Sequence, residues 1–413
     1  MDFALTPEQT QIRQTLRQFF EANASASVIA ELDATATYPA DILDGMASLG
    51  LWGIAVPNSF GGSWTDRVTR CVIIEEIQRA GACLGYAFIP TALFCCEAID
   101  KFGSEALQHE MLPALAAGRL RAAMALSEPN AGSDLMSLAT RGMIEGDELV
   151  LRGQKIFTTG ADAADEILTL VRTDRSAPAR SALTFVLVPR DAPGLEIASL
   201  RKLAGQGTHT CEVFFDDVRV GRDRVVGEIG SGAAVVFELL DADRIYTAAQ
   251  SLGIAQGAFD LARQYACERR QFGRPIIEHQ AVGHMLADME IAIDAARLLT
   301  YRAATLLETG VPCGREASMA KIAASEAGSM CASNGMQILG GYSYMVEYGM
   351  ERYYREAKIQ EIFAGTNQIL RNVLARELAG GMTRGSSSRV GATGRTTTSG
   401  TTAATPMIGQ QPV

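Results

Sequence analysis

The sequence predicts an α+β protein with an N-terminal helical domain, a middle β-domain and a C-terminal helical bundle. Three observations predict this order. Apolar residues recur at helical spacing up to about residue 120, and short β-rich runs separated by turns follow. Long helical patterns return from Gly230. At 413 residues the chain is too long for one compact core, so we expect domains that share a core.

Residues 1–120 are expected to form an all-α domain. The first helix begins at Thr6-Pro7-Glu8, a start signal, and carries Ile12 and Leu16 on its apolar face. Gly and Pro break the patterns that follow. Further helices are expected over residues 40–51, 68–80, 86–102 and 105–117.

The middle domain is expected to span residues 121–229 and the C-terminal domain residues 230–380. Strands are expected at 149–157, 166–172, 183–188 and 211–215. Long helices at 233–270, 277–309, 315–339 and 361–378 are typical of an antiparallel four-helix bundle. The Gly/Ser/Thr-rich tail, residues 381–413, has too few apolar residues to offset its ordering entropy and is expected to be disordered.

Composition limits the possible functions. A net charge of −10 argues against a nucleic-acid surface. No uninterrupted apolar run is expected to reach membrane-spanning length, and the N-terminus lacks a signal-peptide core. The eight cysteines have no zinc-finger spacing, so we expect buried free thiols, no metal and a cytoplasmic location.

One C-terminal stretch, residues 340–376, indicates a ligand site. Two apolar helical patterns in it are separated by Gly365-Thr366-Asn367. Thr366 can cap the second helix, whose first N–H groups would point at an anion. Taken alone, the stretch favours an ordinary helix–turn–helix.

Several strings together resemble the acyl-CoA dehydrogenase family. The C-terminal stretch contains Gly-Gly-Tyr-Ser-Tyr, Arg-Tyr-Tyr-Arg-Glu-Ala-Lys-Ile and Gly-Thr-Asn-Gln-Ile, in the family's order. The resemblance covers about residues 1–380. It implies a middle β-barrel between the helical domains, bound FAD, an acyl thioester substrate, a homotetramer and an electron-transfer flavoprotein as acceptor.

Two further strings carry the resemblance at the flavin. Leu-Ser-Glu-Pro-Asn-Ala-Gly-Ser-Asp, residues 126–134, matches a signature loop, and Gly-Gln-Lys-Ile-Phe-Thr-Thr-Gly, residues 153–160, matches a strand that covers the flavin. Many relatives have Trp where this chain has Phe157, and both provide an aromatic face. The resemblance implies FAD contacts at Leu126, Ser127, Gly132, Ser133, Phe157 and Thr159.

Another part of the FAD site is expected to come from a neighbouring subunit. The string Glu-Arg-Arg-Gln-Phe-Gly-Arg-Pro, residues 268–275, nearly repeats the family's, although helix-ending signals also explain its Arg, Gly and Pro residues. The resemblance implies contacts with the FAD of a neighbouring subunit at Arg269, Gln271, Phe272, Gln337 and Gly341. It implies contacts with the FAD of the same chain at Thr366 and Gln368.

The chain departs from the family at the base. Most members carry a Glu immediately before Gly-Thr, and here that residue is Ala364, which keeps only its backbone N–H for the thioester oxygen. A minority place the base before an Arg on the first bundle helix, in a pattern that Leu-Asp-Ala-Asp-Arg matches at Asp243. We therefore expect Asp243 to be the base and keep Asp241 as a second candidate. The alternatives for Asp243 are a simple ion pair with Arg244 and a solvated position on the helix face.

The predicted function is α,β-dehydrogenation of an acyl thioester bound to CoA or to acyl carrier protein. Two alternatives stay open: an oxygen-using oxidase or monooxygenase of the same fold, and a FAD-binding subunit without activity. The substrate is expected to contact Ser133, Asp241, Arg244, Phe363 and Arg376.

Overall fold

The computed structural model describes residues 3–387 and contains helical domains on either side of a sheet domain. The N-terminal domain starts with a helix that Thr6 caps, because its hydroxyl accepts the Gln9 N–H and Gln9 bonds back to the Thr6 N–H. The expected start signal is therefore confirmed. The helices are α1 (Pro7–Asn23), α2 (Ala26–Thr35), α3 (Ala40–Ser48), α4 (Arg67–Ala80), α5 (Ala82–Ile89), α6 (Cys96–Phe102) and α7 (Glu105–Ala116).

The segment Ala82–Phe102 is long and apolar enough to meet the length and hydropathy criteria for a membrane-spanning helix. Its apolar run is interrupted by Glu97, Asp100 and Lys101, which agrees with the expectation of no uninterrupted run of that length. Helices α5 and α6 are joined in it by one π-helical stretch, Pro90–Cys95. Most of the segment is buried inside the protein, so its apolar character is explained by its place in the helical core.

The middle domain is one eight-stranded sheet in the order β6-β7-β3-β2-β4-β5-β8, with β1 paired to β4. The sheet domain is confirmed. Among the described strands, however, β6 and β8 end the hydrogen-bonded path, so the expected barrel is not closed; β8 has only two residues and pairs with β5 alone. The strands are β1 (Ala122–Ala125), β2 (Arg141–Glu145), β3 (Glu148–Thr159), β4 (Glu166–Arg172), β5 (Leu183–Pro189), β6 (Leu195–Leu200), β7 (Thr210–Gly221) and β8 (Val225–Val226).

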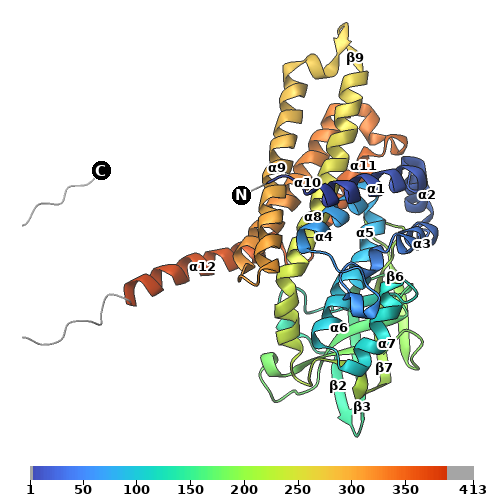
Figure 1. Cartoon of the computed structure of the whole chain (residues 1–413), viewed down its shortest axis with the longest axis vertical. Coiled ribbons are helices and arrows are strands. Elements are labelled where there is room, and N and C mark those ends of the chain that lie inside the picture. Colours follow the sequence, from blue (N-terminus) through green and yellow to red (C-terminus); the bar gives the residue numbers. More distant parts are fainter. Residues whose placement is uncertain (1–2, 388–413) are drawn as a thin grey trace, which may run out of the picture.

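The C-terminal domain packs three long helices with a shorter one. They are α8 (Gly232–Glu268), α9 (Gln280–Glu308), α10 (Gly314–Leu339) and α11 (Met350–Gln360). A hairpin of β9 (Arg270–Gln271) and β10 (Arg274–Pro275) joins α8 to α9 at the end of the molecule opposite the sheet (Figure 1).

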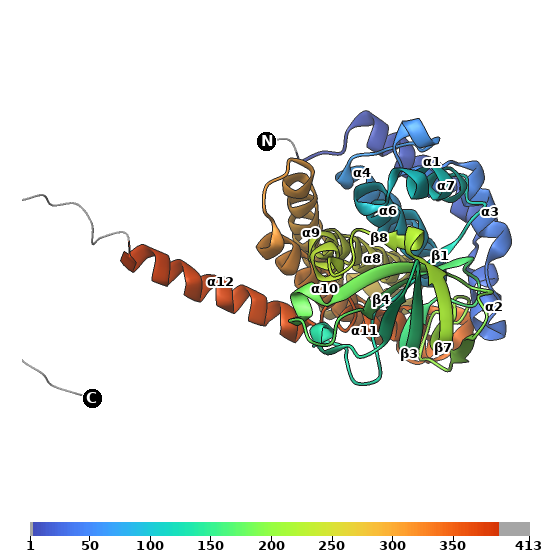
Figure 2. The same ribbon diagram turned by 90° about the horizontal axis from the view of Figure 1, so that it is seen from below.

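The last helix, α12 (Asn367–Ser387), corrects two expectations. It projects from the body instead of completing the bundle, and α11 is the fourth packed helix (Figures 1 and 2). It also continues past residue 380, so residues 381–387 are helical rather than disordered, since extending a formed helix avoids the cost of nucleation. Residues 388–413 of the expected tail lie outside the described part of the chain.

Both helical domains share one core. Buried residues from α1 to α11 form a continuous apolar cluster that also includes Leu170 and Phe185 from the sheet. Helices α4 and α8 approach closely at Gly253. A methyl group there would lie 2.5 Å from the Glu75 carbonyl oxygen and 2.7 Å from Gln78 Cβ.

We predict that Gly253→Ala lowers the midpoint of thermal unfolding, because backbone atoms of α4 cannot move aside; overpacking of this kind costs about 1–3 kcal/mol. Gly328→Ala is the matched control. It also lies inside a long helix, but its methyl group would meet only ordinary contacts, at 3.4 Å. An unchanged midpoint in Gly253→Ala would show that the contact can relax.

Candidate active site

The loop that follows β1 is fastened to β3 by a buried lysine. Lys155 Nζ donates to the Leu126 carbonyl oxygen at 3.0 Å and to Glu128 Oε1 at 2.8 Å. The Ile156 N–H donates to the Ser127 carbonyl oxygen at 2.9 Å. Burial lowers the pKa of Lys155 to about 8, against the opposing effect of Glu128. The two strings that resemble flavin contacts are thus side by side.

Phe157 stands out at the end of this strand. Its φ is +61° and its side chain is 65% exposed, and β3 is irregular against β7 between Lys155 and Thr158. A bulky residue in the left-handed region is strained, and such strain is concentrated at functional sites. The buried Thr158 hydroxyl has no hydrogen-bond partner among the described residues. An open aromatic face beside loop hydroxyls suits a flat heterocyclic cofactor.

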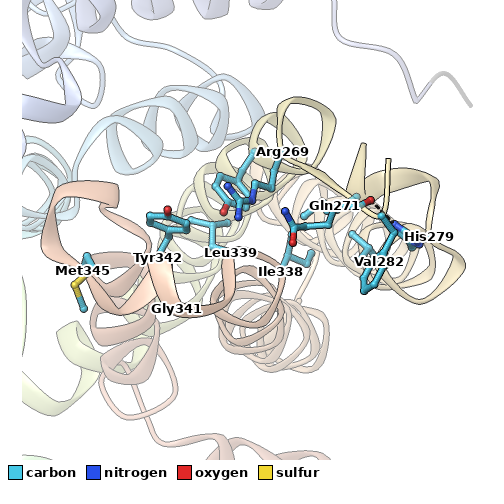
Figure 3. Close-up of a pocket in the computed structure, with 12 residues that line it drawn as sticks. Arg269, Gln271, His279, Val282, Ile338, Leu339, Gly341, Tyr342 and Met345 are labelled. Atoms are coloured by element: carbon cyan, nitrogen blue, oxygen red, sulfur yellow. Dashed lines mark hydrogen bonds between the residues drawn. The ribbon is translucent and has the colours of Figure 1, made fainter. Parts of the chain in front are cut away.

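A second group of predicted contacts lines a groove of about 630 Å³ at the hairpin end of the bundle. Figure 3 shows Arg269, Gln271 and Gly341 along it, together with Tyr342, over whose ring the Arg269 guanidinium lies at 5.5 Å. Arg269 has no carboxylate partner in the described chain, so its fork is available for a phosphate. Gln337 is not among the lining residues.

Phe272 lies at the turn of the hairpin with φ +52° and is 95% exposed. A two-residue turn with positive φ at both positions matches the twist of a hairpin, but Phe is an unusual choice for it. The groove lies at the opposite end of the molecule from the sheet that carries Phe157 (Figure 1). One chain therefore does not bring the two groups of predicted FAD contacts together.

A third group surrounds the turn between α11 and α12. Ala364 has φ +54° and Gly365 φ +87°. Thr366 caps α12, because its Oγ1 accepts the Ile369 N–H at 3.1 Å, which confirms the expected cap. Among the hydrogen bonds of the described residues, none uses the N–H groups of Ala364, Gly365 and Thr366. Consecutive free N–H groups form a concave site for an anionic oxygen.

The side chain of Lys321, on α10, holds this turn. Its Nζ donates to the Gly365 carbonyl oxygen and to Asn367 Oδ1, each at 3.0 Å, and the side chain is fully buried. Burial lowers the pKa of Lys321 to about 8, while Asp243 raises it. Lys321 is not among the site residues predicted from the sequence. Its place on the buried face of α10, with Ala317, Ala320 and Ala324, was the available signal.

Asp243 makes no hydrogen bond in the described chain, and its carboxylate interacts electrostatically with Lys321, which binds the turn. Arg244 pairs instead with Asp241, Nη1 to Oδ1 at 3.0 Å. Burial raises the pKa of Asp243 to about 6, although Arg244 and Lys321 act to lower it. The alternative of a direct ion pair between Asp243 and Arg244 is therefore wrong, and Asp241 is occupied.

The other expected residues take separate places. Glu361 accepts hydrogen bonds from Ser329 and from Lys358 Nζ, the latter at 2.7 Å, so its carboxylate is engaged. Phe363 is half-buried, whereas Gln368 and Arg376 are exposed on α12. Gly132 and Ser133 are exposed on the loop after β1. Their cofactor and substrate roles stay predictions.

Comparison with known proteins assigns all three parts of the chain. Residues 6–119, 123–218 and 230–379 match the N-terminal, middle and C-terminal domains of acyl-CoA dehydrogenase. The short-chain specific acyl-CoA dehydrogenase of Clostridium acetobutylicum is 35% identical over 92% of this chain and its own full length.

Two solved structures are also similar. Glutaryl-CoA dehydrogenase in complex with glutaryl-CoA superposes with a TM-score of 0.89 at 33% identity, covering 92% of this chain and 97% of that one. The prolyl acyl carrier protein oxidase AnaB gives a TM-score of 0.86 at 27% identity, covering 91% of this chain and all of that one.

We predict that Arg269→Leu weakens FAD binding by about ten- to a hundredfold, the loss expected for one charge-assisted hydrogen bond of about 1.5–3 kcal/mol. The measurement is the dissociation constant of FAD from the deflavinated protein. Arg263→Leu, at an exposed position earlier on α8, removes the same charge and should leave binding unchanged. Equal effects of both substitutions would mean that Arg269 acts only through net charge.

Proposed function

The chain belongs to the acyl-CoA dehydrogenase family and uses FAD, and we propose that it introduces an α,β double bond into an acyl thioester with Asp243 as the base. The observation that carries this proposal is the free carboxylate of Asp243 beside the Lys321-held turn. Ala364 cannot accept a proton, and Glu361 is engaged elsewhere. Bound FAD supplies the acceptor for the β-hydride.

Two groups of this chain take part in the proposed proton removal, the Ala364 N–H and the Asp243 carboxylate. A thioester oxygen placed at the free N–H of Ala364 becomes more negative as the α-proton leaves, and a fixed N–H stabilises that charge. The Asp243 carboxylate takes the proton, and a pKa of about 6 leaves it ionised yet basic at neutral pH. Leu126, Ser127, Phe157 and Thr159 are proposed to hold the flavin, while Thr366 and Gln368 are proposed to contact it from the turn.

Assembly and partners form the finer part of the proposal. Arg269, Gln271 and Phe272 belong to the hairpin end of the bundle, whereas Phe157 belongs to the sheet domain at the other end of the molecule (Figure 1), which supports a homotetramer in which the hairpin residues complete a neighbour's FAD site. We propose an electron-transfer flavoprotein as electron acceptor and a cytoplasmic location. The carrier of the acyl group is CoA or acyl carrier protein, and a comparison of which thioester reduces the flavin identifies it.

We predict that an acyl thioester bleaches the visible flavin absorbance of the wild type under anaerobic conditions and that Asp243→Ala loses this reaction by at least about a hundredfold. Asp243→Asn, of nearly the same shape, should be equally slow, whereas Asp243→Glu should retain measurable reduction. Bleaching that survives in Asp243→Ala would place the base elsewhere.

The same experiment separates the alternatives. Rapid reoxidation of the reduced flavin by oxygen would favour an oxidase or monooxygenase. Tight FAD binding without reduction by any CoA or carrier-protein thioester would favour a subunit without activity.

We predict that flavin reduction by thioester falls as pH drops through about 6, because protonated Asp243 cannot act as a base. Lys321→Met should move this acidic limb to higher pH, since the ammonium group that lowers the carboxyl pKa is removed. The measurement is the pH profile of the reduction rate. Lys101→Met, an exposed lysine paired with Glu238, is the control that should leave the limb in place.

A further inference from the structure

The face of α8 that carries Asp243 continues as a row of buried polar residues. Thr247, Gln250 and Ser251 follow Asp243 at positions i+4, i+7 and i+8 and therefore share one side of the helix. Thr247 and Ser251 are fully buried, and Gln250 is nearly so. Thr247 lies one helical turn from Asp243, roughly 6 Å along the axis. An acyl chain that starts at the base and follows this face meets hydroxyl and amide groups.

Neighbouring helices contribute polar groups to the same region. Ser251 Oγ donates to Gln360 Oε1 at 3.2 Å, and Gln360 Nε2 donates to the Tyr86 hydroxyl at 3.2 Å. Gln78, on α4, places its amide against Gly85, next to Tyr86, where a methyl group would overlap Gln78 Oε1. We call Gln78, Tyr86, Thr247, Ser251 and Gln360 the polar lining.

Part of this lining has no partner. The Thr247 hydroxyl is buried without a hydrogen bond in the described chain, whereas the Gln78 amide interacts with the Tyr86 hydroxyl. A buried hydroxyl that stays unpaired destabilises the folded protein. Native proteins rarely leave such groups unpaired unless water or a ligand reaches them. The place of Thr247 beyond the base suggests that the ligand is the acyl group itself.

The polar lining is uncharged at neutral pH. Burial raises the pKa of Tyr86 far above its usual range. Glu356, one turn before Gln360 on α11, is also buried, and burial raises its pKa to about 8. Asp243 and Lys321 belong to the base, and Lys202 lies over the Tyr86 ring, with its Nζ 5.8 Å from the ring centroid. The Thr247 hydroxyl itself carries no charge, so it provides no counter-charge for an ionised acyl terminus.

We propose that the substrate's acyl group carries an uncharged hydrogen-bonding group, a hydroxyl or carboxamide, which the Thr247 hydroxyl binds roughly 6 Å beyond the α-carbon. Gln78 and Tyr86 lie at the far end of the same lining. The inference rests on the proposed function, because Asp243 sets the position of the α-carbon.

The test compares hexanoyl-CoA with its isostere in which a terminal hydroxyl replaces the methyl group. We expect the hydroxyl thioester to reduce the wild-type flavin at least about tenfold more efficiently, because a site that leaves polar groups unpaired discriminates against the apolar analogue. Thr247→Val keeps the shape and removes the hydroxyl, so it should abolish most of this preference. It should also fold well, since it removes an unpaired buried polar atom.

Binding gives a readout that does not depend on turnover. In Asp243→Ala, the dissociation constants of both thioesters are measured from the perturbation of the flavin spectrum, and the same preference is expected. If neither thioester reduces the wild-type flavin, the proposed function fails and the binding comparison still decides the inference. Equal or tighter binding of hexanoyl-CoA, or a preference that survives Thr247→Val, would overturn the inference alone. If the protein prefers glutaryl-CoA, whose acyl group ends in a carboxylate, the proposal that the acyl group carries an uncharged hydrogen-bonding group would be overturned.

Discussion

The buried ammonium group of Lys321 is the interaction on which the candidate active site depends. It binds the Gly365 carbonyl oxygen and the Asn367 side chain, and so fixes the turn between α11 and α12 against α10. The same positive charge lowers the pKa of Asp243, which burial would otherwise raise further. Removing a buried charge leaves the groups that it paired without a partner. Both the conformation of the α11–α12 turn and the pKa of the Asp243 carboxyl therefore depend on the Lys321 side chain.

Lys155 has a comparable role in the sheet domain. Its buried ammonium joins the end of β3 to the loop after β1 through the Leu126 carbonyl oxygen and Glu128. In both places a lysine reaches from a regular element to backbone carbonyl oxygens of an irregular segment. Irregular backbone leaves carbonyl groups without partners in secondary structure, and a buried donor satisfies them while fixing the loop in one conformation.

Local signals in the sequence predicted what depends on neighbours along the chain. The caps at Thr6 and Thr366, the helical and strand patterns and the fold class follow from side chains close in sequence. The direction of α12 and the open sheet depend on packing between distant elements, which periodicity does not encode. The pairing of Arg244 with Asp241 is a contact between positions i and i+3 of one helix, so it was within reach of the sequence. Lys321 was within reach of the sequence, because a lysine on an alanine-rich buried face needs a partner, but that partner lies in a turn that the sequence does not place.

The loss of the usual glutamate and the position of Asp243 form one arrangement. A base on the α11–α12 turn would depend on a segment with two consecutive positive φ angles, whereas α8 is a continuous helix of 37 residues. Side chains on regular elements are held more precisely than those on loops. Precision matters more for aspartate than for glutamate, because the shorter side chain has less reach to correct a misplaced substrate. Ala364 retains the backbone N–H while its methyl group takes little space. Under the proposed function, the turn can therefore still bind the thioester oxygen while Asp243 on the helix removes the proton.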